Sequence, residues 1–349
     1  MKCPYCHADL RYRERSNKTC SKCQRKFVLE PKDNVFRLHD LKLRDLINRL
    51  SKNGTLYITS EQVLGTNLPN QEDYKRGRFS SGCFSLILTF IIAILILIIL
   101  LAILLGSDLT IIFFFIFSMF NFFIILFLSN RRFQVRQNFP SIGHFETTIL
   151  RPWIEQYGKP PQLLLHTDTS ALATALPPIS PNAMQTVILC PSITVRAFII
   201  ANQLPQRFGV VALPPIANEH VQPWLQAVRT RRLPVYVLHE ASVNGCLLMR
   251  DVYQLWQLSP DHPVIDLGIN PRDVNQKTRV LKMRPDPKLL DKVTTFSRLQ
   301  PHEIKWLRQE NVAPLHGLPP TKLLALLLTG KRVAQVGFMS WPKASSSAA

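Results

Sequence analysis

Four cysteines in the first 23 residues constrain what this chain can fold into more than any other feature of its sequence. They form two C-x2-C pairs with 13 residues between them: Cys3 and Cys6, then Cys20 and Cys23. Each pair can present two thiolates to one ion, and the intervening residues can form a hairpin that brings the pairs together. Four thiolates in tetrahedral geometry suit Zn2+. Because about 30 residues cannot fold on a hydrophobic core alone, we expect metal binding to supply the folding energy.

The segment 1–30 resembles the zinc-ribbon family, with all four ligand positions of that family filled. The resemblance implies a closed, structural Zn2+ site and a surface that binds nucleic acid or protein. A redox dithiol and an iron site are the alternatives for the same cysteines. The other three cysteines are scattered at Cys83, Cys190 and Cys246, which indicates a reducing compartment rather than a secreted disulfide scaffold.

Residues 84–130 form an apolar block whose single charged residue is Asp108. Two uncharged segments within it, 84–105 and 109–128, are each long enough to cross the hydrocarbon core of a bilayer as a helix. This pattern predicts a two-span transmembrane hairpin. Because Lys and Arg flank the block on both sides, the positive-inside rule places both chain termini in the cytoplasm. The sequence leaves open whether Cys83, at the edge of the block, is lipidated.

The formal net charge is +19, and both flanks of the apolar block are basic. Such surfaces attract anionic lipid headgroups or nucleic acid. Residues 31–65 have leucines at helical spacing, which predicts a small helical or winged-helix-like module. Residues 66–83 are typical of a linker and 336–349 of a disordered tail.

Residues 145–335 alternate short apolar runs with amphipathic stretches, which predicts an α/β domain with a mostly parallel sheet. The runs, rich in Val, Ile and Leu, lie at 163–166, 186–190, 209–213, 234–238 and 263–267. The predicted fold class is therefore a multidomain membrane protein with a small zinc ribbon, a two-helix transmembrane hairpin and a C-terminal α/β domain.

Polar residues follow several of these runs. Because ligands of parallel sheets bind beyond the carboxyl ends of the strands, we expect these residues to line one cleft. They are Asp168, His239, Glu240, Ser242, Gly245 and Asp266.

The order of segments over about 185–330 resembles the Toprim domain of the topoisomerase VI A-subunit type. The matching stretches are "TVILCPS", "GVVALPP" and "VYVLHEASVNGC". In that family, acidic residues at these strand ends bind Mg2+. Here Glu240 and Gly245 match the family's acid and glycine, but Ser242 stands at the second acid and Pro191 near the acid of the first strand. The resemblance therefore implies a degenerate site, in which Glu240 is the one catalytic candidate.

From these features we expect a membrane-anchored cytosolic scaffold that binds protein or nucleic acid and has a non-catalytic Toprim-like domain. One alternative is a phosphoesterase or nuclease that uses Glu240 and Mg2+. Another is a tether that holds nucleic acid at the lipid bilayer. The sequence does not identify the partner.

Overall fold

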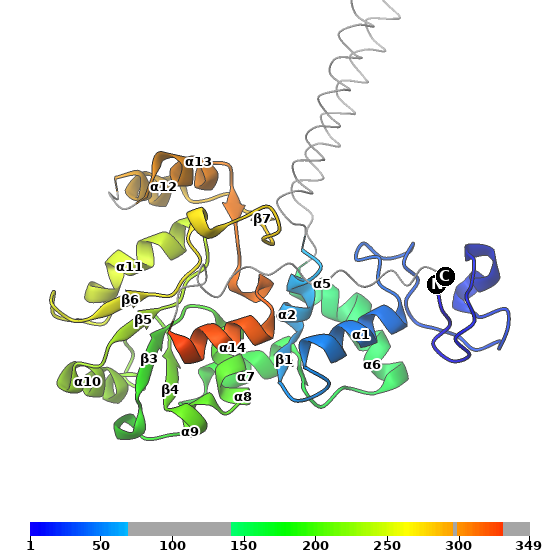
Figure 1. Ribbon diagram of the computed structural model, residues 1–349, viewed down its shortest axis with the longest axis horizontal. Coiled ribbons are helices and arrows are strands. Elements are labelled where there is room, and N and C mark those ends of the chain that lie inside the picture. The colour runs from blue at the N-terminus through cyan, green and yellow to red at the C-terminus, as the bar shows by residue number, and fades with distance from the viewer. Residues whose placement is uncertain (69–140, 296–298, 331–349) are drawn as a thin grey trace, which may run out of the picture. The chain divides into compact units, whose positions relative to one another are not determined.

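The computed structural model describes residues 1–68, 141–295 and 299–330 (Figure 1). These residues belong to one compact unit, so the segments before and after 69–140 pack together. The predicted linker lies mostly outside the described residues, and the predicted C-terminal tail lies wholly outside them.

The N-terminal part consists of a 3-10 segment, η1 (Tyr12–Lys18), helix α1 (Asp40–Leu50), a two-residue strand β1 (Ile58–Thr59) and helix α2 (Ser60–Gly65). Helix α1 buries Leu43, Leu46, Ile47 and Leu50, which recur at the spacing of one helix face. Helix α2 begins with a capping box, in which the side chain of Thr59 accepts from the Gln62 amide and the side chain of Gln62 accepts from the Thr59 amide.

The chain continues through α5 (Ile142–Phe145), the π-helical turn η2 (Glu146–Leu150), α6 (Arg151–Tyr157), β2 (Leu163–Leu164) and α7 (His166–Thr174). Strand β2 pairs in parallel with β1, more than 100 residues earlier in the chain. The ring of Phe36 also packs edge-on against Phe145, with the ring centres 4.9 Å apart. These contacts join the two described parts of the chain.

A four-stranded sheet forms the centre of the C-terminal part. Its strands are β3 (Thr186–Leu189), β4 (Val210–Leu213), β5 (Val235–Val237) and β6 (Val264–Asp266), in the order β4-β3-β5-β6. All three neighbouring pairs are parallel. The predicted parallel α/β sheet is therefore confirmed. The first predicted run, 163–166, contributes β2 instead, which pairs with β1.

Helices cover both faces of this sheet. Helices α10 (Gln222–Arg231) and α11 (Val243–Leu255) share one core with alternate strand residues; its members include Val187, Leu189, Val211, Val235, Trp224 and Val252. Helix α8 (Ile193–Ala201) contributes no side chain to that core within the described residues and packs against α7, α9 (Leu204–Phe208) and β4. The chain moves in one direction along the sheet from β3 to β4, and in the opposite direction from β4 to β5 and from β5 to β6. Because crossovers between parallel strands are right-handed, the connecting helices of the two directions lie on opposite faces.

The remaining elements follow β6 in the chain. They are η4 (Pro271–Asp273), the antiparallel pair β7 (Leu281–Lys282) and β8 (Asn311–Val312), helices α12 (Pro287–Thr294), α13 (Pro301–Arg308) and α14 (Pro320–Thr329), and η5 (Leu315–Gly317). The short turn η3 (Pro181–Ala183) precedes β3. A bridge between Ala241 and Ala313 connects the end of β5 to this last part of the chain.

The predicted membrane architecture is corrected by the structure. The described residues contain no helix that is both long and apolar enough to cross a membrane. Their longest helix, α11, has 13 residues, which is about 20 Å against the roughly 30 Å of a hydrocarbon core. The predicted membrane fold class and the predicted two-span localisation are therefore wrong. The described residues instead form a four-cysteine cluster and an α/β domain with a parallel sheet. The segments that prompted the prediction, 84–105 and 109–128, lie outside the described residues.

Candidate metal centre and sheet-edge site

The two cysteine pairs lie in two turns of the same construction. The Cys3 amide donates to the carbonyl of Ala8 at 2.9 Å, and the Cys20 amide donates to that of Arg25 at 3.0 Å. Antiparallel bridges close each turn, between Lys2 and Asp9 and between Thr19 and Lys26. The sequence therefore builds one local motif twice.

Backbone conformation aims the sulfur atoms of each turn. The residue after each second cysteine, His7 or Gln24, has a left-handed φ of 56° or 59°, a conformation that folds the chain back sharply. Amides of the turns also point at sulfur: that of Tyr5 lies 3.5 Å from the Cys3 Sγ, and that of Lys22 lies 3.4 Å from the Cys20 Sγ. Such donors stabilise thiolates, the form that binds metal.

The four Sγ atoms lie at the distances that a tetrahedral metal requires. Cys3 Sγ is 3.7 Å from Cys23 Sγ, Cys6 Sγ is 3.8 Å from Cys20 Sγ, and all four lie within 4.8 Å of one another. A tetrahedron with metal–sulfur bonds of about 2.3 Å has edges of about 3.8 Å. A disulfide would need about 2.05 Å. The predicted cluster is thus present, and its four cysteines can hold one metal ion.

The hydrophobic cluster inside this ribbon is small. Its buried cluster consists of Cys3, Leu10 and Cys20, with Tyr5 and Ala8 among the partly buried residues around it.

Burial raises the pKa of the Cys3 thiol to about 11. Burial also acts to raise the pKa of Cys20, but hydrogen bonds from backbone amides and neighbouring thiols outweigh it and lower that pKa to about 7.

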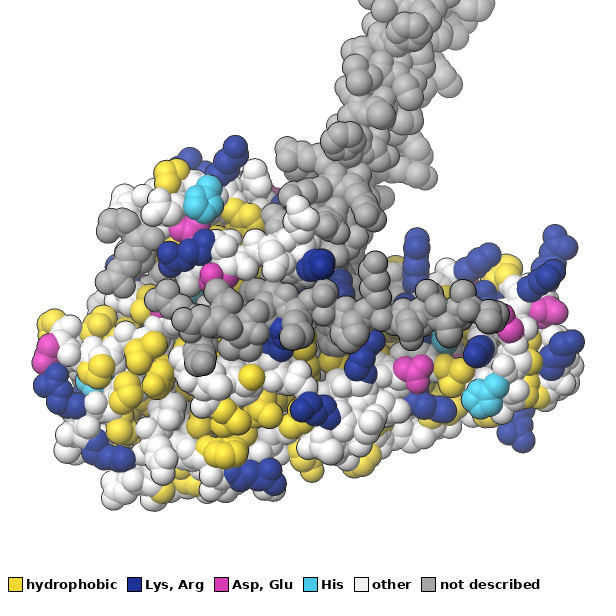
Figure 2. Space-filling model, in the orientation of Figure 1, with side chains coloured by type: hydrophobic (Ala, Val, Ile, Leu, Met, Phe, Trp, Pro, Cys, Tyr) yellow, Lys and Arg dark blue, Asp and Glu magenta, His cyan; other side chains and the backbone are white. Residues whose placement is uncertain are grey.

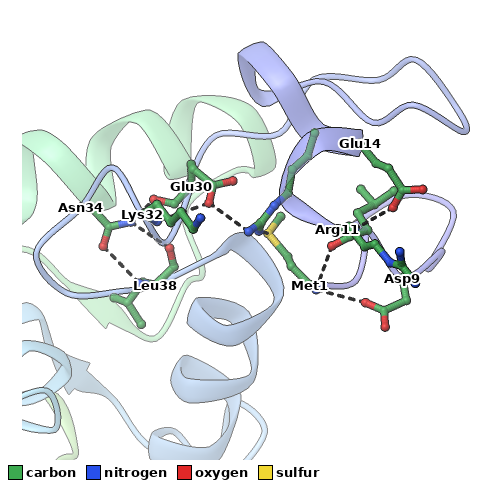
Figure 3. A network of polar contacts seen from close by, with 10 residues as sticks. Met1, Asp9, Arg11, Glu14, Glu30, Lys32, Asn34 and Leu38 are labelled. Carbon is green, nitrogen blue, oxygen red and sulfur yellow. Dashed lines mark hydrogen bonds and ion pairs between the residues drawn. The ribbon is translucent and has the colours of Figure 1, made fainter.

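Polar contacts attach the ribbon to the following loop (Figure 3). Arg15 Nη2 lies 3.3 Å from Glu30 Oε1, and both side chains are at most 10% exposed. The Asn34 side chain donates to the carbonyls of Glu30 and Leu38 and accepts from the Leu38 amide. The fully buried Asp40 accepts from two further backbone amides, those of Val28 and Leu29. These bonds fix the path of the chain from the ribbon into α1.

The ribbon surface combines exposed cations with tyrosine rings. Tyr12 is 51% exposed, and Lys32 Nζ lies 3.7 Å from the centre of its ring. Arg25 lies similarly over Tyr5 at 5.3 Å. Figure 2 shows Lys and Arg side chains projecting from the part of the molecule that is dark blue in Figure 1.

A second polar cluster lies at the carboxyl edge of the parallel sheet. His239, directly after β5, is fully buried, and its Nε2 is 3.2 Å from Oδ1 of Asp266, the last residue of β6. Its Nδ1 donates to the carbonyl of Glu240 at 2.9 Å. The ring therefore lies between two acceptors, the Glu240 carbonyl and the Asp266 carboxylate.

Asp266 is fully engaged by its own chain. It accepts from the Gly268 amide at 2.8 Å and from the Asn270 side chain at 2.9 Å, in addition to its contact with His239. Burial acts to raise its pKa, but these partners outweigh burial and lower the pKa to about 2. The carboxylate is therefore a structural anion, because its oxygens already have partners.

Two glycines allow this packing. A Cβ on Gly268 would lie 2.3 Å from the His239 ring, and a Cβ on Gly245 would lie 2.1 Å from the Glu240 carbonyl oxygen. Ser242 is the N-cap of α11, where its hydroxyl accepts from the Gly245 amide at 3.0 Å. Gly245 and Ser242 thus have structural roles at the start of α11.

Glu240 is the one acid of this cluster that the chain leaves largely unengaged. Burial raises the pKa of its carboxyl, although a hydrogen bond with Ser242 and the charge of His239 act to lower it. The structure thus places five of the six predicted cleft residues together: His239, Glu240, Ser242, Gly245 and Asp266. Asp168 lies apart, in the first turn of α7, where it pairs with Lys159 at 2.6 Å and accepts from the Leu165 amide.

Two further groups were not found from the sequence. Arg196 lies buried at the start of α8, beside the end of β3. Glu61, Glu146 and His166 meet where α2, η2 and α7 join; Glu61 pairs with the His166 ring, and Glu146 accepts from the His166 amide. The sequence signal for Arg196 is that it is the one charged residue in the otherwise mostly apolar stretch "ITVRAFIIA". The second depends on contacts between distant segments and had no local signal.

Comparison with known proteins does not extend these observations: no protein-family model, curated protein or solved structure matches the chain.

Proposed function

We propose that this chain is a non-catalytic binding protein whose ribbon holds Zn2+ and binds nucleic acid. The main support is the surface of the ribbon, where the exposed ring of Tyr12 lies among many cations. The exposed Lys and Arg side chains of residues 1–32 are Lys2, Arg11, Arg13, Lys18, Lys22, Arg25, Lys26 and Lys32. Among the ion pairs of the described residues, none joins these cations to a carboxylate.

Nucleic acid fits this surface better than an acidic protein does. Cations that are free of carboxylates can bind successive phosphates, and exposed aromatic rings give bases a face on which to stack. The exposed acids of the ribbon and its following loop are few: Asp9 pairs with the N-terminal ammonium at 3.0 Å, and Asp33 follows Lys32. The charge of the ribbon surface is therefore mainly positive.

Zinc is the metal that suits the four-cysteine cluster best. Four thiolates at the edges of a tetrahedron match its preferred ligands and geometry, and a site with four protein ligands has no open position for substrate. The metal would then have a structural role, holding the two turns in place and so fixing the cations on them.

The α/β domain supports a binding role rather than phosphoesterase chemistry. A Toprim-type Mg2+ site needs several carboxylate oxygens. In this chain Asp266 is engaged by Gly268, Asn270 and His239. Among the described residues, the four-cysteine cluster is the only group of three or more His, Cys, Asp or Glu side chains close enough to hold a metal ion, so Glu240 does not belong to one. We propose that this domain keeps a Toprim-like sheet without the family's chemistry.

Fluorescence anisotropy with a labelled single-stranded oligonucleotide tests the binding role on the full, zinc-loaded chain. We expect affinity to fall steeply between 50 and 200 mM salt, since several phosphate contacts release counterions. Replacing Tyr12 with Ala should weaken binding about five- to hundredfold, the usual range for one stacked base. Tyr57, which is 40% exposed outside the ribbon, supplies the matched control: Tyr57→Ala should bind like the natural protein. Salt-independent binding, or none, would refute the proposal.

A nuclease and phosphoesterase assay with Mg2+ or Mn2+ tests the non-catalytic part separately. We expect no turnover above background from the natural protein. Activity that Glu240→Ala removes would overturn this part and would leave the nucleic-acid result standing.

A further inference from the structure

The parallel sheet has a topological switch point between β3 and β5. These strands are neighbours, with Leu189 opposite Val237, so their carboxyl ends lie side by side. The helix after β5, α11, packs in the core with α10, whereas the helix after β3, α8, packs against α7. The chain therefore leaves the two strand ends toward opposite faces. In open α/β sheets, ligands bind at this point.

The N-terminus of α8 lies at this switch point and offers unused donors. The helix has nine residues, and its N-cap Ser192 accepts from the Val195 amide at 3.4 Å. The next two amides, of Ile193 and Thr194, donate in none of the hydrogen bonds between described residues. Free amides and the helix dipole favour an anion at such a position.

Arg196 adds a buried charge to the same place. The residue is 9% exposed, and its side chain folds back toward the start of the helix. Nη1 donates to the carbonyls of Cys190 at 2.9 Å and Pro191 at 3.1 Å, and Nε donates to that of Ala173 at 3.5 Å. No bond within the described residues uses Nη2, and none of their ion pairs includes Arg196.

The neighbouring groups do not neutralise this guanidinium. Burial raises the pKa of the Cys190 thiol to about 12, so the thiol stays uncharged near neutral pH. Glu240, across the switch point on the β5 side, also acts on that thiol, but none of the ion pairs of the described residues joins it to Arg196. A buried cation without a paired anion is costly. The cost would be offset by an anion that arrives from solution.

We propose that the switch point binds a phosphoryl group, held by the Arg196 guanidinium and the free amides of Ile193 and Thr194. Three donors from one helix turn match the several oxygens of a tetrahedral oxyanion, and Nη2 of Arg196, the nitrogen that no bond within the described residues uses, can donate to one of them as part of a charged group. This site is separate from the ribbon surface, so the proposal of a phosphoryl site does not depend on nucleic-acid binding by the ribbon.

Isothermal titration with inorganic phosphate, at constant ionic strength and with the full zinc-loaded chain, tests the site. We expect saturable binding that Arg196→Gln weakens about tenfold or more, the worth of a charge-assisted hydrogen bond. Arg207→Gln is the matched control, because Arg207 is an exposed cation on α9. It should leave phosphate affinity unchanged.

A second variant removes a donor without touching the charge. Ile193 is the first residue of α8, where proline is tolerated, and Ser192 before it has φ −72° and ψ 114°, which proline permits in its predecessor. Ile193→Pro should therefore keep the fold and still weaken phosphate binding at least about threefold. Glu240→Gln should strengthen binding, because it removes a negative charge near the site.

The same titration distinguishes the source of the phosphoryl group. A 5′-phosphorylated oligonucleotide that outcompetes its unphosphorylated form would indicate a nucleic-acid end, whereas equal competition would indicate free phosphate or a small phosphate ester. Absence of saturable phosphate binding to the natural protein would overturn the proposal. So would unchanged affinity in Ile193→Pro, even if Arg196→Gln failed to fold.

Discussion

The buried Asp266 carboxylate, with its partners His239, Asn270 and Gly268, should supply a measurable and pH-dependent part of the stability of the α/β domain. The pKa of Asp266 is lowered to about 2 in the folded protein, from an ordinary value of 3.8. A difference of nearly two pKa units corresponds to about 2 kcal/mol. Because Asp266 is 11% exposed, solvent screens little of this interaction. Asp266→Asn should therefore lower the free energy of unfolding by about 2 kcal/mol at pH 7.

The sign of the pH dependence follows from the same shift. The folded state binds the Asp266 proton less tightly than the unfolded chain, so this contribution is fully present above about pH 5. It is lost as pH falls through 3.8 toward 2. The gap between the natural protein and Asp266→Asn should thus close at low pH.

Urea unfolding followed by tryptophan fluorescence measures this gap, because Trp224 and Trp256 lie in the core beside the sheet. Asp261 provides a matched control: its pKa is also lowered to about 2, through Ser259 and Arg232, but it is exposed on the surface. Asp261→Asn should leave stability nearly unchanged at moderate salt. An Asp266→Asn variant as stable as the natural protein at pH 7, or a gap that persists at pH 2, would refute the reasoning.

Three further predictions concern packing, metal and chain organisation. Gly268→Ala should destabilise the protein by about 1–3 kcal/mol in urea unfolding, because a Cβ would lie 2.3 Å from the His239 ring; Gly143→Ala, whose Cβ meets nothing closer than 3.9 Å, should not destabilise it. Cys20→Ser should reduce bound zinc, measured by elemental analysis, from about one per chain to none, whereas Cys246→Ala should leave it unchanged. Replacing residues 69–140 with a Gly/Ser linker of about 12 residues, which reaches roughly 19 Å, should keep zinc content and cooperative thermal unfolding, because β1 pairs with β2 across that segment. Loss of either property would contradict this last prediction.

The features that were predictable from the sequence depend on local chemistry. The cysteine cluster follows from short spacings within one segment, and the two turns that build it are each closed by neighbours in the chain. The parallel sheet follows from short apolar runs separated by helical stretches. The positions of His239, Glu240, Ser242 and Gly245 followed for the same reason, because a strand end and the helix after it are local features.

The features that were missed depend on where elements end or on distant contacts. Asp168 was expected at a strand end, but the strand stops at Leu164 and α7 begins at His166, so Asp168 caps a helix instead. The pairing of Ile58 with Leu163 joins positions whose sequences give no sign of each other. The membrane prediction relied on apolar composition in a segment that lies outside the described residues, and the helices of the described ranges gave it no support.

The position of Ser242 explains how the sheet edge can keep its shape without the acids of a Mg2+ site. A serine at an N-cap satisfies a helix amide as well as an aspartate does, and here it accepts from Gly245. Asp266 is held by three partners, His239, Gly268 and Asn270, so it is needed for packing. With those two positions committed to structure, the net charge at the neighbouring switch point is set by Arg196 against Glu240. Since the described residues gather no group of three possible metal ligands around Glu240, and none of their ion pairs includes Arg196, the switch point favours an anionic ligand over a metal cation.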